Sequence, residues 1–418
     1  MEDLDRRLLL GAAGLAGVAA FAGRAKAGPL APPAGPVAST GKQLTELEPR
    51  TAINATNTPG DSTSLYIISQ SGSYYLTGNI NAASGKHAIK ITAHDVTIDL
   101  CGFTMKGIVG ALDGVNAASG TRNTVITNGT IADFGGGGIN NNGSVSSRFT
   151  DLNLTTNAAG GLATGTDATV ERVNVRGGTV GIAVGDRSRV VNCEARDIIT
   201  NGSGILAGQN CVIQGCVALI CAGPCIDAAN GSIVRDCNGS GSTASHGIRV
   251  NYGASVIGCV ANANSLNGIE AIQRNLVFNC EAVANTQHGI HANFSGLVQG
   301  CFCESNGQCG IFSDGGGAVT IRGNTCGENG NSAAANGAGI RVTGAAGNLI
   351  EGNHVSANFK GVDAISTRNA IYGNRAIVNA TDYVFGVGNS CGPVVNVAGA
   401  PDVSTVANAN HPLANLRF

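Results

Sequence analysis

The chain has 418 residues, enough for a sizeable core, but charged residues make up only 12% and aromatic residues 4%, with no tryptophan. A surface this poor in charge is unlike that of a typical globular protein. The formal net charge of −2 provides no bulk field for binding nucleic acid or an anionic membrane, so neither partner is expected. The abundant glycines lack the triplet period of collagen, and the regular recurrence of Val, Ile and Leu argues against disorder.

The first residues are typical of an export signal. Arg6 and Arg7 precede an apolar run to about Gly23, which is too short to span a bilayer comfortably, and residues 25–27 fit signal-peptidase cleavage. The leader resembles a twin-arginine signal, although Asp5 stands where Ser or Thr is usual, and an ordinary secretion signal is the alternative. We therefore expect an exported protein, periplasmic or extracellular at the cell surface, whose mature form has no transmembrane segment.

The rest of the chain repeats with a period near 21 residues. This period is too short for paired-helix repeats and lacks the leucine-rich consensus, so each repeat is expected to be a coil of short strands joined by tight turns. The repeats align on a small residue followed by an aliphatic one, and the aliphatic members, 20 to 23 residues apart except for one step of 29, are Ile139, Leu162, Ile182, Ile205, Ile226, Ile248, Ile269, Ile290, Ile311, Ile340, Val362 and Val384.

Each repeat shows the two-residue alternation of a strand. Ile248 and Val250 flank Arg249, so the aliphatic side chains should face inward and the charge outward. A second inward column of β-branched residues is expected at Val190, Ile213, Val234, Val256, Val277, Val298, Ile321, Ile350 and Ile371. Two residues after each of these stands a type that tolerates a left-handed backbone, which predicts a bend at Asn192, Gly215, Asp236, Gly258, Asn279, Gly300, Gly323, Gly352 and Gly373.

Two columns of small polar residues complete the repeat. The residue after each bend forms a column of Cys193, Cys216, Cys237, Cys259, Cys280, Cys301, Asn324, Asn353 and Asn374. A further column marks another turn at Asn264, Asn285, Asn306, Asn329, Asn358 and Asn379. Stacked Cys behaves as a compact apolar residue, and stacked Asn can hydrogen-bond along the array. Ladders of this kind resemble those of right-handed parallel β-helices of the pectate-lyase-like superfamily.

The resemblance implies an all-β fold, a single right-handed parallel β-helix of about 12 coils with a cap at each end. The flanking segments EPRTAINATNTPGDSTSLYIISQSGSYYLTGNI and GPVVNVAG resemble exported bacterial β-helix repeat proteins without known activity. Caps are needed to cover the open terminal coils against edge pairing. The expected segments are a signal peptide at 1–27, a Pro/Gly-rich linker at 28–50, an N-terminal cap at 51–84, the β-helix at 85–385, and a C-terminal cap and tail at 386–418.

The fourteen cysteines do not suggest a regular disulfide framework. Neighbours in the stacked column point the same way at a spacing of about 4.8 Å, a poor geometry for bridges, so we expect free thiols there. The pairs Cys303 with Cys326 and Cys221 with Cys225 are better candidates for disulfides. Metal binding by CAGPC is a weaker hypothesis, because no second Cys or His pair at ligand spacing accompanies it.

Candidate functional residues come from the outward positions of coils 227–291. The position after the aliphatic anchor is occupied by Asp227, Arg249, Glu270 and His291, the position two before it by His246, Asn267 and His288, and the strand ends supply Tyr252 and Arg274. This is the densest group of ionisable side chains in the array. The alternative interpretation is a solvated ladder of acids and bases, each pair worth a fraction of a kcal/mol.

The resemblance implies polysaccharide, most specifically a uronic-acid polymer, as the partner, and lyase or epimerase chemistry. Arg249, His288 or His291 would then serve as base or charge neutraliser and Tyr252 as acid, with His246 and Glu270 completing the site. Calcium is the cofactor that the resemblance suggests, with Asp227 and Glu270 as its carboxylates.

Two other functions remain open. An inverting glycoside hydrolase could use Asp227 and Glu270, two coils and roughly 9 to 10 Å apart, although Arg249 between them would hold both ionised. A structural or glycan-binding envelope protein would need no catalysis, but the absence of Trp weakens tight sugar stacking.

Overall fold

The computed structural model describes residues 48–330, 337–344, 346–400 and 402–418, and Arg50–Phe418 form one compact unit. The expected signal peptide and almost all of the expected linker lie outside the described residues. Among those that are described, no helix is long and apolar enough to cross a membrane. One short 3-10 turn, η1 (Val403–Thr405), accompanies the strands in this part of the chain.

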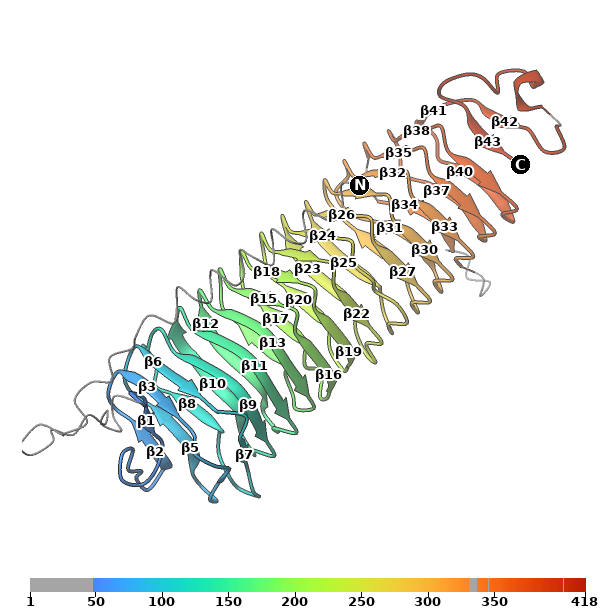
Figure 1. Cartoon of the computed structure of the whole chain (residues 1–418). Helices are drawn as coiled ribbons and strands as arrows, with labels where there is room; N and C mark the ends of the chain where they lie inside the picture. Colours follow the sequence, from blue (N-terminus) through green and yellow to red (C-terminus); the bar gives the residue numbers. More distant parts are fainter. Residues whose placement is uncertain (1–47, 331–336, 345, 401) are drawn as a thin grey trace, which may run out of the picture. The chain divides into compact units, whose positions relative to one another are not determined.

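The unit is a parallel β-solenoid in which each coil contributes one strand to a continuous face (Figure 1). This face is a 15-stranded sheet made of β2 (Ser64–Ile68), β5 (His87–Ile91), β8 (Val115–Ala117), β10 (Gly137–Val145), β12 (Gly160–Thr166), β14 (Ile182–Val184), β17 (Ile205–Ala207), β20 (Ile226–Ala228), β23 (Ile248–Tyr252), β25 (Ile269–Gln273), β28 (Ile290–Ala292), β31 (Cys309–Ser313), β34 (Ala338–Val342), β37 (Lys360–Ala364) and β40 (Thr381–Phe385). The expected dozen coils is therefore too low, because the described chain already forms fifteen.

Two further sheets form the remaining faces of the solenoid. The larger has 21 strands: β1 (Thr51–Ala52), β3 (Gly72–Tyr75), β4 (Ile80–Asn81), β6 (Val96–Asp99), β7 (Thr104–Lys106), β9 (Val125–Ala132), β11 (Arg148–Thr155), β13 (Thr169–Arg176), β15 (Arg189–Val191), β16 (Glu194–Ile198), β18 (Val212–Gln214), β19 (Val217–Cys221), β21 (Ile233–Arg235), β22 (Asn238–Ser240), β24 (Ser255–Ile257), β26 (Leu276–Phe278), β29 (Leu297–Gln299), β32 (Thr320–Arg322), β35 (Leu349–Glu351), β38 (Ala370–Tyr372) and β41 (Ser390–Cys391). The smaller has seven: β27 (Glu281–Val283), β30 (Phe302–Glu304), β33 (Thr325–Gly327), β36 (His354–Ser356), β39 (Arg375–Ile377), β42 (Val394–Asn396) and β43 (Asn415–Arg417).

The aliphatic anchors stack in register inside the solenoid, as the repeat predicts. Ile139 pairs with Leu162, and the same register continues strand by strand to Val362. The last anchor is wrong by one residue: Val362 pairs with Tyr383, which leaves Val384 on the outward side. In the anchor position the Tyr383 hydroxyl lies 2.8 Å from the carbonyl oxygen of Asn374 and 2.7 Å from that of Leu416, so its one proton is shared between them and joins the last coil to the C-terminal strand.

The second inward column and its bends are confirmed. The predicted β-branched residues, Val190 through Ile371, pair in register and are fully buried. All nine predicted bend residues have a left-handed backbone, with φ between 51° and 66°. A residue with φ in this range is costly for most side chains, which explains why Gly, Asn and Asp alternate at this position.

Buried asparagines hold successive coils together. In the column from Asn264 to Asn379, each side-chain oxygen after the first accepts hydrogen bonds from the backbone and the side-chain amides of the preceding Asn, and each Nδ2 also donates to a backbone carbonyl. The thiol column continues in the same way as Asn324, Asn353 and Asn374, and Asn415 extends it into the C-terminal segment. These bonds satisfy polar groups that have no access to water.

All fourteen cysteines remain thiols, and no disulfide links any of them. The column thiols are buried and lie 3.1 to 3.8 Å from backbone carbonyls, as in Cys237 with the carbonyls of Arg235 and Ile213. The predicted disulfides between Cys303 and Cys326 and between Cys221 and Cys225 are not formed. The first pair lies on adjacent strands in direct register, so the two Cβ atoms point the same way, which disfavours a bridge.

The terminal segments are partly coil rather than cap. The strands β2, β3 and β4 pair with β5, β6 and β7, so residues 64–81, predicted to belong to a cap, already form the first coil. At the other end, β43 pairs with β39 and β42, and Val395, Val397 and Ala414 form a small separate core. Both ends therefore finish the solenoid by continuing its own pairing.

Removing one member of the asparagine column should destabilise the solenoid strongly. Asn306→Ala would leave the two amides of Asn285, the carbonyl of Ala282 and Asn329 Oδ1 short of partners inside the core. We expect a loss of about 3 kcal/mol in denaturant unfolding, whereas exposed Asn174→Ala should cost under about 0.5 kcal/mol. Equal effects of the two substitutions would contradict a structural role for the column.

Thiol accessibility should distinguish the column from the surface. In the native protein an alkylating reagent should label exposed Cys391 readily and half-buried Cys101 more slowly, while the other twelve stay protected. Denaturation without a reductant should expose all fourteen. Mass spectrometry that finds pairs resistant to alkylation until reduction would show that disulfides form after all.

Candidate functional site

Seven outward residues of the 15-stranded sheet stack in register on successive strands and form what we call the outer ladder. They alternate in charge except for one aromatic ring, and in chain order they are Asp227, Arg249, Glu270, His291, Phe312, Arg341 and Asp363. The predicted outward column is thus confirmed, and it extends three coils beyond the predicted site.

The first pair of the outer ladder is a bidentate ion pair. Arg249 donates from Nε to Asp227 Oδ1 at 3.0 Å and from Nη2 to Asp227 Oδ2. The aspartate side chain is 10% exposed, but the arginine remains 41% exposed. The carboxylate therefore fixes the guanidinium in place at the surface, where it can still meet a ligand.

The centre of the outer ladder is a histidine held between two carboxylates. His291 Nδ1 lies 3.0 Å from Glu270 Oε2, and its Nε2 lies 3.0 Å from Asp314 Oδ1. Asn267 donates from Nδ2 to the same Glu270 oxygen at 2.6 Å. Asp314 was not predicted, because it lies just after β31, outside the anchor columns that the repeat defines.

The environment separates the protonation states of these groups. Burial lowers the pKa of His291, but the hydrogen bonds and charges of Glu270 and Asp314 outweigh it and the pKa is raised. Burial raises the pKa of Glu270, but the hydrogen bonds from His291 and Asn267 with the charge of His291 lower it overall. The surroundings thus favour the ionised form of Glu270 and the protonated form of His291.

His246 and His288 both support the backbone, which for His288 differs from its predicted role as base or charge neutraliser. His246 Nδ1 accepts from the Asn267 amide at 3.3 Å, and His288 Nδ1 accepts from the Cys309 amide at 3.2 Å. Asn267 does the same between them by accepting from the His288 amide. With Nδ1 engaged as an acceptor, each neutral ring carries its proton on Nε2 and can donate but not abstract a proton.

Burial also favours the neutral form of His246 and His288. It lowers the pKa of His246, and it lowers the pKa of His288 to about 4, where the charge of His291 contributes further. Both rings are therefore neutral near pH 7. The sequence signal that could have shown this is the alternation of His246, Asn267 and His288 in one column, because Asn and neutral His are both backbone acceptors.

Tyr252 does not join the cluster. Its hydroxyl accepts from Arg274 Nη1 at 2.6 Å, and the Arg274 guanidinium lies over its ring at 5.3 Å. Three residues along β23 separate it from Arg249, about 10 Å of extended chain. The structure therefore places the predicted acid at the strand end with Arg274, away from Glu270 and His291.

The far half of the outer ladder holds a second group that sequence reasoning missed. Asp363 has a fully buried side chain, with Lys360 Nζ at 2.8 Å and Arg341 Nε at 3.6 Å from its Oδ2. Phe312 stacks on His288 with ring centroids 4.3 Å apart and on His291 at 5.2 Å. The only sequence signal was the continuation of the outward column past His291.

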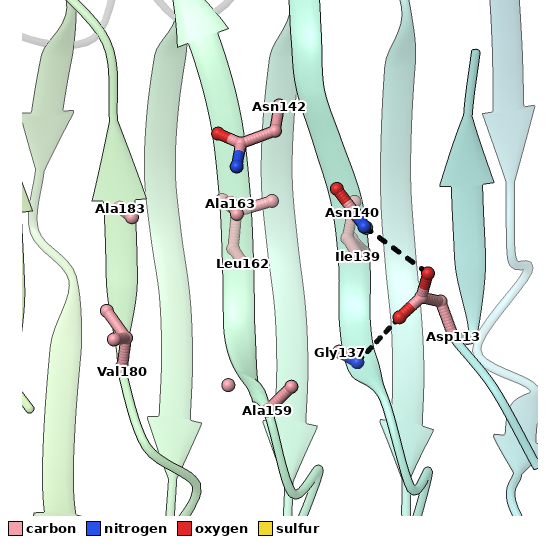
Figure 2. A pocket seen from close by; sticks show the side chains of 11 residues that line it. Asp113, Gly137, Ile139, Asn140, Asn142, Ala159, Leu162, Ala163, Val180 and Ala183 are labelled. Atoms are coloured by element: carbon pink, nitrogen blue, oxygen red, sulfur yellow. Dashed lines mark hydrogen bonds between the residues drawn. The ribbon is translucent and has the colours of Figure 1, made fainter. Parts of the chain in front are cut away.

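A small cavity lies on the same face, nearer the N-terminal end. It has a volume of about 240 Å³, and glycine, alanine and asparagine residues of β10, β12 and β14 line much of it. Figure 2 shows Asp113 at one side of it, accepting from the Gly137 amide at 2.7 Å and from Asn140. In register, Ala183 of this cavity is followed by Leu206 and then Asp227, so the cavity and the outer ladder follow one another on one sheet face.

The site residues do not fit calcium. Both oxygens of Asp227 are bound by Arg249, which stands between Asp227 and Glu270 in register, so a shared cation would have to displace a guanidinium. Among the described residues, no three His, Cys, Asp or Glu side chains gather as a metal site. No step is therefore assigned to a metal.

Residues 161–297 match the family model described as right handed beta helix region. The solenoid is a right-handed parallel β-helix. The matched stretch begins in β12 and ends at the start of β29, so it contains Asp227, Arg249, Glu270 and His291 but not the far half of the outer ladder.

A search of curated protein sequences found no match. Among solved structures, similarity extends to the A-modules of two mannuronan C-5 epimerases of Azotobacter vinelandii: AlgE6 (17% identity, TM-score 0.49, covering 77% of this chain and 89% of that one) and AlgE4 (15%, 0.47, 77% and 91%). The catalytic domain of a GH87 α-1,3-glucanase is also similar (11%, 0.40, 71% and 62%). At these identities and scores, substrate and chemistry must be inferred from the site itself.

The acid sensitivity of folding should depend on His288. Its pKa in the folded protein, about 4, lies below the ordinary 6.5, so unfolding takes up a proton between these values and stability is lost as pH falls from about 6.5 to about 4. The loss through this one residue should be about 3 kcal/mol. His288→Asn, which keeps a backbone acceptor as Asn267 does, should flatten this part of the stability curve.

His291 provides the opposite control. Its raised pKa contributes stability below about pH 6.5, and this is lost as pH rises through the folded-state pKa. His291→Asn should therefore change the curve in the neutral to alkaline range only. Unfolding midpoints measured across pH test each assignment. A wild-type slope below pH 6.5 in His288→Asn would contradict the first, and an unchanged curve at neutral to alkaline pH in His291→Asn would contradict the second.

Proposed function

We propose that the protein is exported and binds an acidic polysaccharide along the outer face of the 15-stranded sheet, where it acts on uronic-acid units as a lyase or epimerase. The observation that supports this most is the Glu270–His291–Asp314 arrangement beside Arg249 on successive coils. It places a carboxylate with a lowered pKa, an imidazole with a raised pKa and an exposed guanidinium on one accessible face. One sugar unit spans about one to two coils at the strand spacing, so it can meet all three.

The chemistry requires a proton to leave the carbon beside the uronate carboxylate. Arg249 is the group positioned to pair with that carboxylate and stabilise the negative charge that develops. The ionised Glu270 is the acceptor for the proton, and protonated His291 is the donor to the leaving glycosidic oxygen in elimination. In epimerisation a proton from solvent is instead delivered to the opposite face of the same carbon, and Glu270 releases the proton that it took to solvent. His246 can donate an Nε2–H to a sugar oxygen.

A hydrolase built on Asp227 and Glu270 is less favoured by this geometry. General-acid catalysis of glycoside hydrolysis needs a carboxyl group that keeps its proton. Asp227 is held by both arms of Arg249, and the pKa of Glu270 is lowered. Neither environment retains a proton.

The second candidate function is glycan binding without catalysis. Inter-coil ion pairs recur elsewhere on the solenoid, as in Arg187 with Asp167 and Arg172 with Asp151, so the charged residues of the outer ladder need not be catalytic. These pairs are exposed and lie off the 15-stranded sheet. The two candidates share the same face and differ in whether a proton is transferred there.

Arg249→Ala should abolish activity on uronic-acid polymers without unfolding the protein. Incubation with alginate and polygalacturonate should produce new ultraviolet absorbance for a lyase, or altered uronate stereochemistry by NMR for an epimerase, in the wild type only. Arg187→Ala is the matched control, because Arg187 makes the same bidentate contact with an aspartate at an exposed turn. It should retain full activity.

The outcomes separate the candidates. New reducing ends without unsaturation would assign a hydrolase instead. Retained binding of the polymer with no chemical change in the wild type would favour the non-catalytic function. If neither binding nor chemistry is found for acidic or neutral polysaccharides, with or without calcium, the outer ladder is a structural array of ion pairs.

A further inference from the structure

The far half of the outer ladder carries an excess of positive charge that the near half lacks. Near the reactive cluster, Arg249 is matched by Asp227, and His291 by Glu270 and Asp314. Farther along, Arg341 and Lys360 share the single carboxylate of Asp363. Two cations on one buried carboxylate give this group a net charge of about +1, whereas in the near half three carboxylates face Arg249 and His291.

The hydrogen bonding of this group is incomplete. Arg341 Nε and Asp363 Oδ1 are buried and have no hydrogen-bond partner. A buried polar atom without a partner costs about 1 to 3 kcal/mol, so such atoms call for an explanation. Lys360 is 21% and Arg341 13% exposed, and both are anchored by Asp363 with part of each side chain still in reach of a ligand.

An aromatic ring adjoins the two cations. Phe312 precedes Arg341 in register, and its ring is stacked on the imidazoles of His288 and His291 from the coil before. The ring is partly exposed, and the next coil in register is that of Arg341. Among the described residues, the guanidinium groups that lie over aromatic rings are those of Arg50 and Arg274, so Arg341 does not cover Phe312.

We propose that Phe312, Arg341 and Lys360 form a binding subsite for one uronate unit of the polymer, with the sugar ring against Phe312 and its carboxylate between the two cations. The inference rests on the proposed function and deepens it. Arg341 follows His291 by two coils, about 10 Å, so this unit is the neighbour of the one that meets Glu270 and His291. The subsite anchors the polymer, and the near half of the ladder performs the chemistry.

The absence of tryptophan from the chain makes a direct test feasible. In Phe312→Trp the new indole keeps an aromatic surface and is the sole tryptophan fluorophore. Titration with oligouronates should shift its emission, whereas neutral oligoglucans should not. The control is Phe302→Trp, at a 40% exposed position of β30 in the seven-stranded sheet, whose emission should stay constant.

Charge is tested by Lys360→Gln, which leaves the Arg341–Asp363 pair intact. Calorimetric titration should show about tenfold weaker binding of oligouronates and unchanged binding of neutral oligosaccharides. In a turnover assay KM should rise while kcat stays the same. Phe312→Leu should weaken binding, whereas Phe312→Trp, which keeps an aromatic ring, should bind like the wild type. Thermal unfolding of each variant should be measured alongside to show that both are folded.

Failure of this subsite is distinguishable from failure of the proposed function. Suppose that the wild type binds oligouronates and Arg249→Ala loses activity. If the indole emission of Phe312→Trp then does not change on titration, or Lys360→Gln binds like the wild type, the subsite is overturned and the proposed function stands. If the wild type binds no uronate oligomer, both are overturned.

Discussion

Every residue of the solenoid has its own copies as neighbours, because equivalent positions of successive coils pair in register at about 4.8 Å. This constraint determines what each column can contain. Inside, aliphatic residues stack on aliphatic residues, and asparagines satisfy one another. At the bends only residues that accept a left-handed backbone are found. A substitution that does not fit its column therefore disturbs the packing of the coils on both sides.

The same constraint creates the outer ladder. A charged side chain that faces outward has only the adjacent rungs as close partners, so opposite charges must alternate or be held by a lateral group. Asp227 with Arg249 and Glu270 with His291 follow this rule. The rule fails at Arg341, Lys360 and Asp363, where two cations share one carboxylate. Such a departure is what a bound anion would complete.

Histidine takes two roles in adjacent columns of this face. His291 belongs to the outer ladder, and two carboxylates raise its pKa. His246 and His288 lie in the column two residues before the aliphatic anchor, accept backbone amides, and have lowered pKa values. One residue type therefore supplies both a held proton and a neutral donor within three coils. The histidine that contacts the carboxylates and the histidines that accept backbone amides thus lie within the same short stretch of chain.

The sequence by itself determined the columns: the period defines which residues stack, and it correctly predicted the anchors up to Val362, the bends and the unbridged thiol column. It could not decide between Tyr383 and Val384, because both are apolar and the choice depends on carbonyls of the last coil and the C-terminal strand. The repeat also does not determine which neighbouring residue each outward side chain contacts. Contacts of Tyr252 with Arg274, of His288 with a backbone amide, and of His291 with Asp314 arise from neighbours outside the periodic positions, and only the tertiary structure brings them together.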